Sequence, residues 1–268
     1  MDDYPVKLGR MLFTMVDPAR GFEVAYNRWY ERDHFYAGCL AGPGLFAGKR
    51  FVATRQLKDL RFPSESLFAE PVDAGSYLSI YWTLAGHATE HFSWAAKQVV
   101  WLYKNGRGFH ERTHAHTALY DIASTAYRDD DGVPVELALD HPYKGLAVVV
   151  VEPATGASSA SMLGWLEAGP VRSLLQSGGV DSVASFTLFE DPVVASGGFK
   201  PPMAMGSEGG SERRLVQLCF LTEEPAAIWD GFRAYGSDVE AAGPGRVSFA
   251  APFVPTIVGT DRYTDELW

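Results

Sequence analysis

The feature that most constrains this chain is that one order of strand-like and helix-like patterns occurs twice. In the first half, residues 8–16, 45–54, 77–84 and 112–122 are strand-like, and residues 21–40 and 87–103 have the apolar spacing of helices. The second half repeats this order, with strands at 144–152, 180–190, 214–222 and 246–258 and helices at 158–176 and 225–235. The sequence therefore predicts two consecutive β-α-β-β-α-β units.

Aligned positions and a polar connection support this division. Trp29 matches Trp165, and Gly44 matches Gly179 with a one-residue gap. An acidic stretch at 128–133 and the His141-Pro142 turn separate the halves. We predict a first unit at 1–125 with the candidate active site, a linker at 126–142, and a second, structural unit at 143–268. The alternative is a pair of unrelated α+β domains.

Composition limits the classes of partner. The 268 residues are 47% hydrophobic and carry a net charge of −10, with no cluster of Lys and Arg that would bind a phosphate backbone. Cys39 and Cys219 are far apart, which favours neither a disulfide framework nor a thiolate metal cluster. Residues 1–10 lack a secretory pattern, and no run reaches about 18 apolar residues. We expect a cytoplasmic protein that binds a small molecule, with neither nucleic acid nor membrane as partner.

One stretch resembles a known superfamily. It consists of residues 26–34 (YNRWYERDH), Leu40, Pro43-Gly44 and residues 49–51 (KRF). This pattern resembles the first helix and second strand of the dimeric α+β barrel superfamily, with EthD-like and muconolactone-isomerase-like members most similar. The resemblance implies an α+β fold in which two tandem ferredoxin-like repeats form an intrachain dimeric α+β barrel. Helices would cover the outside, and ligands would lie between a sheet and its helices or inside the barrel.

The second half departs from that pattern. Trp165 is followed by Leu166 and Glu167, so a counterpart of His34 is missing. Some two-repeat members of the superfamily bind haem through a helical histidine of the C-terminal repeat. The second unit has no histidine at all, so the resemblance does not carry that haem site over to this chain.

The histidines lie almost entirely in the first half. Of the seven, all but His141 fall between His34 and His116, and imidazole is the usual proton shuttle near neutral pH. His34 follows Tyr30 and Asp33 and precedes Tyr36 at the end of the first predicted helix. We predict His34 as the general acid or base, and the alternative is a histidine that caps the helix end.

Strand alternation predicts a polar surface. His114, His116 and Tyr120 fall on one face of the fourth strand, and Tyr77 and Tyr81 fall on one face of the third. We expect these faces, with Arg50 from the second strand, to look into the barrel, and the face with Leu78, Ile80, Trp82 and Leu84 to pack under the helices. The alternative is an ordinary polar interface between the two units.

Metal binding is the weaker interpretation of these histidines. His87 and His91 stand four residues apart on the second predicted helix, and His110, His114 and His116 form another group. Neither group has a recognised ligand spacing, so we predict no metal and no other cofactor.

These observations predict a cofactor-independent isomerase, cyclase or lyase that acts on an aromatic or lactone-like compound. His34 would move the proton, and Tyr30 and Asp33 would orient the His34 imidazole. The developing oxyanion would be stabilised by His91, His114, Arg50 or Tyr81. Substrate-binding residues would be Trp29, Tyr36, Arg50, Tyr77, Tyr81, His116 and Tyr120. Alternatives are a cofactor-free monooxygenase of polyphenols and a non-catalytic ligand-binding protein. We expect a monomer or homodimer.

Overall fold

The computed structural model describes residues 5–189, 204–206 and 213–268. The first half contains β1 (Leu8–Pro18), α1 (Glu23–Trp29), the π-helix η1 (Tyr30–Leu40), β2 (Leu45–Val52), α2 (Arg55–Lys58), β3 (Tyr77–Leu84), α3 (Ala88–Lys104) and β4 (Arg112–Tyr127). The second half contains the 3₁₀ turn η2 (Val135–Leu137), β5 (Gly145–Pro153), α4 (Ser159–Ala168), α5 (Pro170–Gln176), β6 (Val180–Phe189), β7 (Leu215–Leu221), the 3₁₀ turn η3 (Pro225–Ile228), α7 (Trp229–Ala242) and β8 (Gly245–Pro255).

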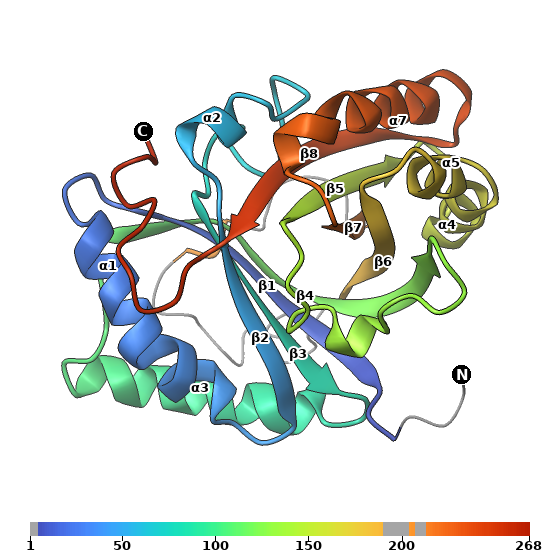
Figure 1. Ribbon diagram of the computed structural model, residues 1–268. Coiled ribbons are helices and arrows are strands. Elements are labelled where there is room, and N and C mark those ends of the chain that lie inside the picture. The colour runs from blue at the N-terminus through green and yellow to red at the C-terminus, as the bar shows by residue number, and fades with distance from the viewer. Residues whose placement is uncertain (1–4, 190–203, 207–212) are drawn as a thin grey trace.

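The eight strands form one closed antiparallel barrel in the order β1-β3-β2-β8-β5-β7-β6-β4. The first-half strands are adjacent in the order β4-β1-β3-β2, and the second-half strands in the corresponding order β8-β5-β7-β6. The halves join at β4 with β6, a long seam from Leu119↔Phe189 to Tyr127↔Ser182, and at β2 with β8, a short seam of two pairs. The predicted mixed α and β architecture is confirmed, because helices lie outside the barrel on both halves (Figure 1).

The barrel interior is an apolar core built from both halves. Leu78, Ile80 and Trp82 of β3 contribute to it together with Val148 and Val150 of β5. The prediction that this face of β3 packs under the helices was wrong, since Tyr77 and Tyr81 occupy the helix-facing side. Alternation separates the two faces of a strand, but both faces are buried here, so the pattern by itself does not assign either face to a compartment.

A second apolar core fills the space between the second-half sheet and its helices. It includes Val149 and Val151 of β5, Leu166 of α4, Leu174 of α5 and Phe232 of α7. The predicted helix at 158–176 is divided at Gly169-Pro170 because proline supplies no backbone donor within a helix. This division brings α5 against both α7 and β6.

Two irregular segments cross the first half. The predicted loop at 55–75 contains α2 and sends Phe68 into the barrel core. The segment at 256–268 leaves β8 and runs beside α1 (Figure 1).

The predicted loop at 191–212 lies outside the described residues except for residues 204–206. No described helix is both long enough and apolar enough to cross a bilayer.

Candidate functional site

The layer between the first-half sheet and its helices is lined by aromatic rings. Tyr26 and Tyr30 come from α1 and η1, and Tyr77 and Tyr81 come from β3; all are buried. The Tyr26 ring lies 5.4 Å from that of Tyr77, and the Tyr30 and Tyr81 hydroxyls are hydrogen-bonded at 2.9 Å. Burial raises the pKa of Tyr77 to about 12 and that of Tyr81 well above its ordinary value, so both phenols stay protonated at neutral pH.

Arg50 of β2 brings a buried positive charge into this layer. Its guanidinium carbon lies 4.5 Å from the centre of the Tyr30 ring and 4.9 Å from that of Tyr77. Its Nη1 donates to Asn27 Oδ1 at 2.9 Å and to Glu31 Oε1 at 3.2 Å. The Nε and Nη2 atoms are buried and have no hydrogen-bond partner in the described structure. Buried donors in this state favour an acceptor that the protein itself does not supply.

His34 stands on the π-helix with its ring stacked on Trp29. The two ring centres are 4.5 Å apart with an interplanar angle of 19°. The ring also lies over Gly38 of the same helix, where a Cβ atom would come within 2.9 Å of it, so Gly38 leaves the room that the ring uses. Desolvation, assisted by the neighbouring Arg112 and His114, lowers the pKa of His34 to about 3. The imidazole is therefore neutral at physiological pH.

His114 reaches the same layer because β4 has a bulge. Met15 pairs with His116, but the next residue, Val16, pairs with His114, so Ala115 is the extra residue. The bulge turns His114 toward the outer layer while His116 points into the barrel. The prediction that His114 and His116 share one face was therefore wrong, since a bulge interrupts the two-residue period on which it relied.

A second arginine, Arg112, determines the tautomer of His114 and helps to keep its imidazole neutral. Arg112 donates through Nε to His114 Nε2 at 3.4 Å, so His114 Nδ1 carries the proton and donates to Thr117 Oγ1 at 2.7 Å. Desolvation and Arg112 lower the pKa of His114 to about 3. The Arg112 guanidinium carbon lies 4.7 Å from the Trp29 ring centre, and its buried Nη1 has no partner among the described residues.

His116 and Tyr120 lie together inside the barrel, as the sequence predicted for these two. His116 Nε2 is 2.7 Å from the Tyr120 hydroxyl, and its ring stacks on Phe68 with the centres 3.8 Å apart. Burial lowers the pKa of His116 to about 3. The predicted polar interior is thus divided, because Arg50, Tyr77, Tyr81 and His114 belong to the outer layer instead.

Three other predicted site residues have different surroundings. The Asp33 carboxylate pairs with Arg107, with Nε to Oδ2 at 3.0 Å, and it has no described hydrogen bond to His34. Tyr36 is 50% exposed. His91 is buried in α3, where its Nδ1 donates to the Pro43 carbonyl at 3.1 Å. No described contact joins His91 to the layer around Arg50.

The sequence-based prediction missed Tyr26, Asn27, Glu31, Phe109 and Arg112. Arg112 had a detectable signal, because it stands two residues before His114 in the predicted fourth strand and so shares its face. Phe109 stacks on Trp29 at 5.3 Å from the loop before β4, and no periodic pattern marks it.

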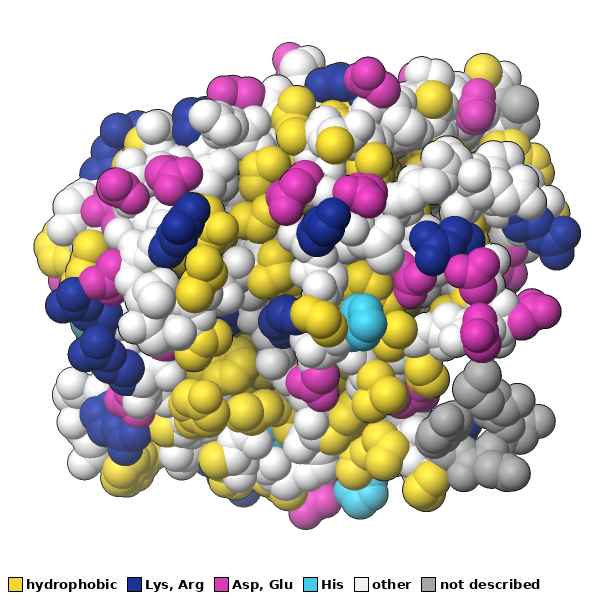
Figure 2. Space-filling model, in the orientation of Figure 1, with side chains coloured by type: hydrophobic (Ala, Val, Ile, Leu, Met, Phe, Trp, Pro, Cys, Tyr) yellow, Lys and Arg dark blue, Asp and Glu magenta, His cyan; other side chains and the backbone are white. Residues whose placement is uncertain are grey.

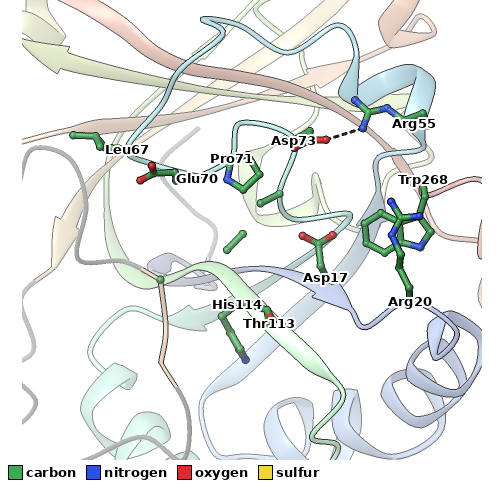
Figure 3. A pocket seen from close by; sticks show the side chains of 13 residues that line it. Asp17, Arg20, Arg55, Leu67, Glu70, Pro71, Asp73, Thr113, His114 and Trp268 are labelled. Atoms are coloured by element: carbon green, nitrogen blue, oxygen red, sulfur yellow. Dashed lines mark hydrogen bonds and ion pairs between the residues drawn. The ribbon is translucent and has the colours of Figure 1, made fainter.

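A cavity of about 530 Å³ opens beside His114 (Figure 3). Its wall contains acidic side chains, basic side chains and the indole of Trp268. Figure 3 shows Trp268 beside Arg20 on one side of the cavity, and Thr113 and His114 at the bottom of the view. The lining includes Asp17, Arg20, Arg55, Glu70, Asp73, Thr113, His114 and Trp268. The face of the molecule in Figure 2 also mixes basic and acidic side chains, with no extended area of one sign.

The corresponding layer of the second half does not fit haem. The described residues there include no histidine, the Cys219 thiol is buried within the apolar core, and the Tyr235 hydroxyl donates to Gln217 at 2.7 Å. Aliphatic and aromatic side chains fill the layer. In the described part of the chain, no three His, Cys, Asp or Glu side chains gather closely enough to hold a metal ion.

Comparisons with known proteins show the fold alone. No family model matches the chain, and no curated protein matches it. Among solved structures, it is similar to an anthrone oxidase-like protein, with 13% identity, 95% of each chain covered and a TM-score of 0.53. It is also similar to a chlorite dismutase-like protein, with 9% identity, coverage of 98% of this chain and 100% of the other, and a TM-score of 0.51. Both neighbours are dimeric α+β barrel proteins.

Proposed function

We propose that the first half binds a flat, weakly acidic aromatic compound as its anion, between the sheet and α1 and η1, and oxidises it with dioxygen without a cofactor. The observation that carries this proposal is the contrast between the two layers. The second-half layer is closed by apolar side chains, whereas the first-half layer holds two arginines with unpartnered buried donors among aromatic rings.

The site suits an anion better than a neutral ligand. Guanidinium groups in a desolvated layer stabilise a phenolate or enolate strongly, because the surroundings screen the charges weakly. Arg112 has no carboxylate partner among the described residues, and it helps to keep His34 and His114 neutral. A bound anion would compensate that positive charge, while Trp29, Phe109 and the tyrosines offer faces on which a planar ring can stack.

In the proposed reaction, the substrate supplies the electrons. An enolisable carbon loses its proton to water, and the resulting carbanion, delocalised onto the phenolate oxygen held by the arginines, reduces dioxygen and forms a carbon–oxygen bond. The peroxide anion formed in this way takes a proton back from water and becomes a hydroperoxide. The hydroperoxide then loses water by breaking its oxygen–oxygen bond, which leaves a carbonyl. One dioxygen is consumed and one water is released for each methylene converted. The anthrone oxidase-like neighbour makes an anthrone the first compound to test.

The protonation state of the imidazoles favours oxygenation over the proton-transfer reactions. An isomerase, cyclase or lyase needs a base whose pKa lies near the working pH, and His34 and His114 have pKa values of about 3. Anion stabilisation by Arg50 and Arg112 acidifies the substrate itself and so requires less of a base. We therefore place oxygenation before the proton-transfer reactions.

We also propose that the halves are two ferredoxin-like repeats, at 1–125 and 143–268, joined by a linker at 126–142. The second repeat would take the place that a partner subunit occupies in a dimeric barrel. The matching strand orders, β4-β1-β3-β2 and β8-β5-β7-β6, support this proposal.

Oxygen uptake with 1,8-dihydroxyanthrone tests the function. We expect enzyme-dependent uptake of one dioxygen per anthraquinone formed, and a loss of about 100-fold in kcat/KM for Arg112→Gln. Arg246→Gln is the matched control, because its side chain is 66% exposed on the second half. Equal rates in wild type and Arg112→Gln would contradict the proposal. Turnover without oxygen uptake would favour an isomerase or lyase, and binding without turnover a ligand-binding protein.

A further inference from the structure

The segment at 256–268 contacts the helix that carries the first-half site. Gly259 donates its amide to Glu31 Oε2 at 3.0 Å, and the Thr260 carbonyl accepts from Asn27 Nδ2 at 2.9 Å. Asp261 pairs with Arg28, with its Oδ1 3.0 Å from Arg28 Nε. Residues more than 200 positions away in sequence therefore hold one side of α1 and the start of η1.

Two of the side chains that this segment holds, Asn27 and Glu31, also bind Arg50. Asn27 uses its amide nitrogen for the segment and its oxygen for Arg50 Nη1. Glu31 uses Oε2 for Gly259 and Oε1 for the same Nη1. Each therefore bridges the segment and the guanidinium, and this arrangement leaves Arg50 Nε and Nη2 without a protein partner in the described structure.

The other end of the segment is anchored separately. Leu267 is fully buried, and its carbonyl accepts from Lys58 Nζ at 3.2 Å. Trp268 donates through Nε1 to Glu23 Oε1 at 2.6 Å and forms part of the wall of the cavity beside His114 (Figure 3). A change at Gly259 can therefore alter the contact with Glu31 while these anchors stay in place.

We propose that the segment at 256–268 is a positioning element of the first-half site. It fixes Arg50 through Asn27 and Glu31, so that the guanidinium meets the anionic part of the ligand with Nε and Nη2. The ligand part of this inference rests on the function proposed above, whereas the positioning of Arg50 is a property of the ligand-free protein. The second half would thus contribute to the site through the chain that follows its last strand.

Two substitutions at Gly259 differ in whether they keep the amide contact with Glu31. Gly259 has φ +83°, and a Cβ there would meet nothing within 4 Å. Gly259→Ala keeps the amide donor and adds only the strain of a left-handed alanine. Gly259→Pro removes the donor and cannot adopt this φ. A chain that ends at Val258 removes the remaining contacts and is the third variant.

The first measurement needs no ligand. Hydrogen exchange of the Arg50 Nε–H, followed by ¹⁵N NMR, should be slow in wild type and in Gly259→Ala, and at least about tenfold faster in Gly259→Pro and in the shortened chain. If exchange is equally slow in all folded variants, the segment does not position Arg50 and the inference is overturned. Thermal unfolding and circular dichroism identify variants that have lost the fold. If the shortened chain is unfolded, the comparison of Gly259→Pro with wild type decides the inference.

The second measurement uses two probes, 1,8-dihydroxyanthraquinone, which ionises, and unsubstituted anthraquinone, which does not. Gly259→Pro should weaken binding of the ionised probe about fivefold, raise the apparent pKa of the bound phenol in the visible spectrum, and change the affinity for the neutral probe less than about twofold. A merely structural role would weaken both probes equally and leave the bound pKa unchanged. If wild type binds neither probe, the proposed function fails, and Arg50 exchange alone decides this inference.

Discussion

Acid should destabilise this protein steeply between about pH 6.5 and pH 5, because three buried imidazoles are neutral in the folded state. His34, His114 and His116 have pKa values of about 3, whereas an unfolded histidine titrates near about 6.5. Since these folded pKa values are depressed, the unfolded chain binds more protons throughout this window. The contribution of these neutral imidazoles to the free energy of unfolding is therefore fully present above about pH 6.5, and it is lost as the pH falls toward 3.

The size of the effect follows from the proton count. Each imidazole that is charged only when unfolded contributes about 1.4 kcal/mol per pH unit, or about 2 kcal/mol between pH 7 and pH 5. The three together give about 4 kcal/mol per pH unit, a large fraction of the about 5–15 kcal/mol by which domains are usually stable. Carboxylates contribute to the pH dependence of stability mainly below about pH 5, because their pKa values in the unfolded chain are about 4.

His116 allows this reasoning to be tested at one site, since its side chain is fully buried in the barrel. Urea unfolding across the window should give a dependence on pH that is shallower by about 1.4 kcal/mol per pH unit in His116→Asn than in wild type. Tyr120→Phe is the matched control, because it removes the phenol bonded to His116 and keeps the imidazole. An unchanged slope in His116→Asn, or an equal flattening in Tyr120→Phe, would refute the reasoning.

Three further perturbations address the first-half layer. Arg112→Gln should raise the pKa of His114 by about one unit or more, since the charge 3.4 Å away is lost, and NMR titration of the imidazole would show no change if that charge were screened. Gly48→Ala should lower the free energy of unfolding by about 1–3 kcal/mol, because the added Cβ would lie 2.9 Å from the Tyr81 ring, and denaturant unfolding measures this. Tyr30→Phe should cost about 1 kcal/mol by removing the hydroxyl bonded to Tyr81, and a stability equal to wild type would show that this bond contributes nothing.

Much of the fold follows from local patterns. The strands from β1 to β8 begin within two residues of their predicted starts, because β-branched and aromatic runs bounded by Gly and Pro favour strands. The predicted helix at 21–40 is helical, but its change to a π-helix at Tyr30 was not foreseen. Periodicity identifies a helix without determining how its turns are wound.

The sequence identified the site by residue type and placed His116 and Tyr120 correctly inside the barrel, but it assigned Arg50, Tyr77, Tyr81 and His114 to the wrong layer. The sequence by itself determined the twofold order of elements, the confinement of histidines to the first half, and the alternation that groups Tyr77 with Tyr81. Only the tertiary structure decided which face of β3 meets the helices, since both faces are buried. A bulge at Ala115 separated His114 from His116, and long-range contacts brought Gly259 to Glu31. These outcomes depend on packing between distant segments, which short-range sequence patterns do not encode.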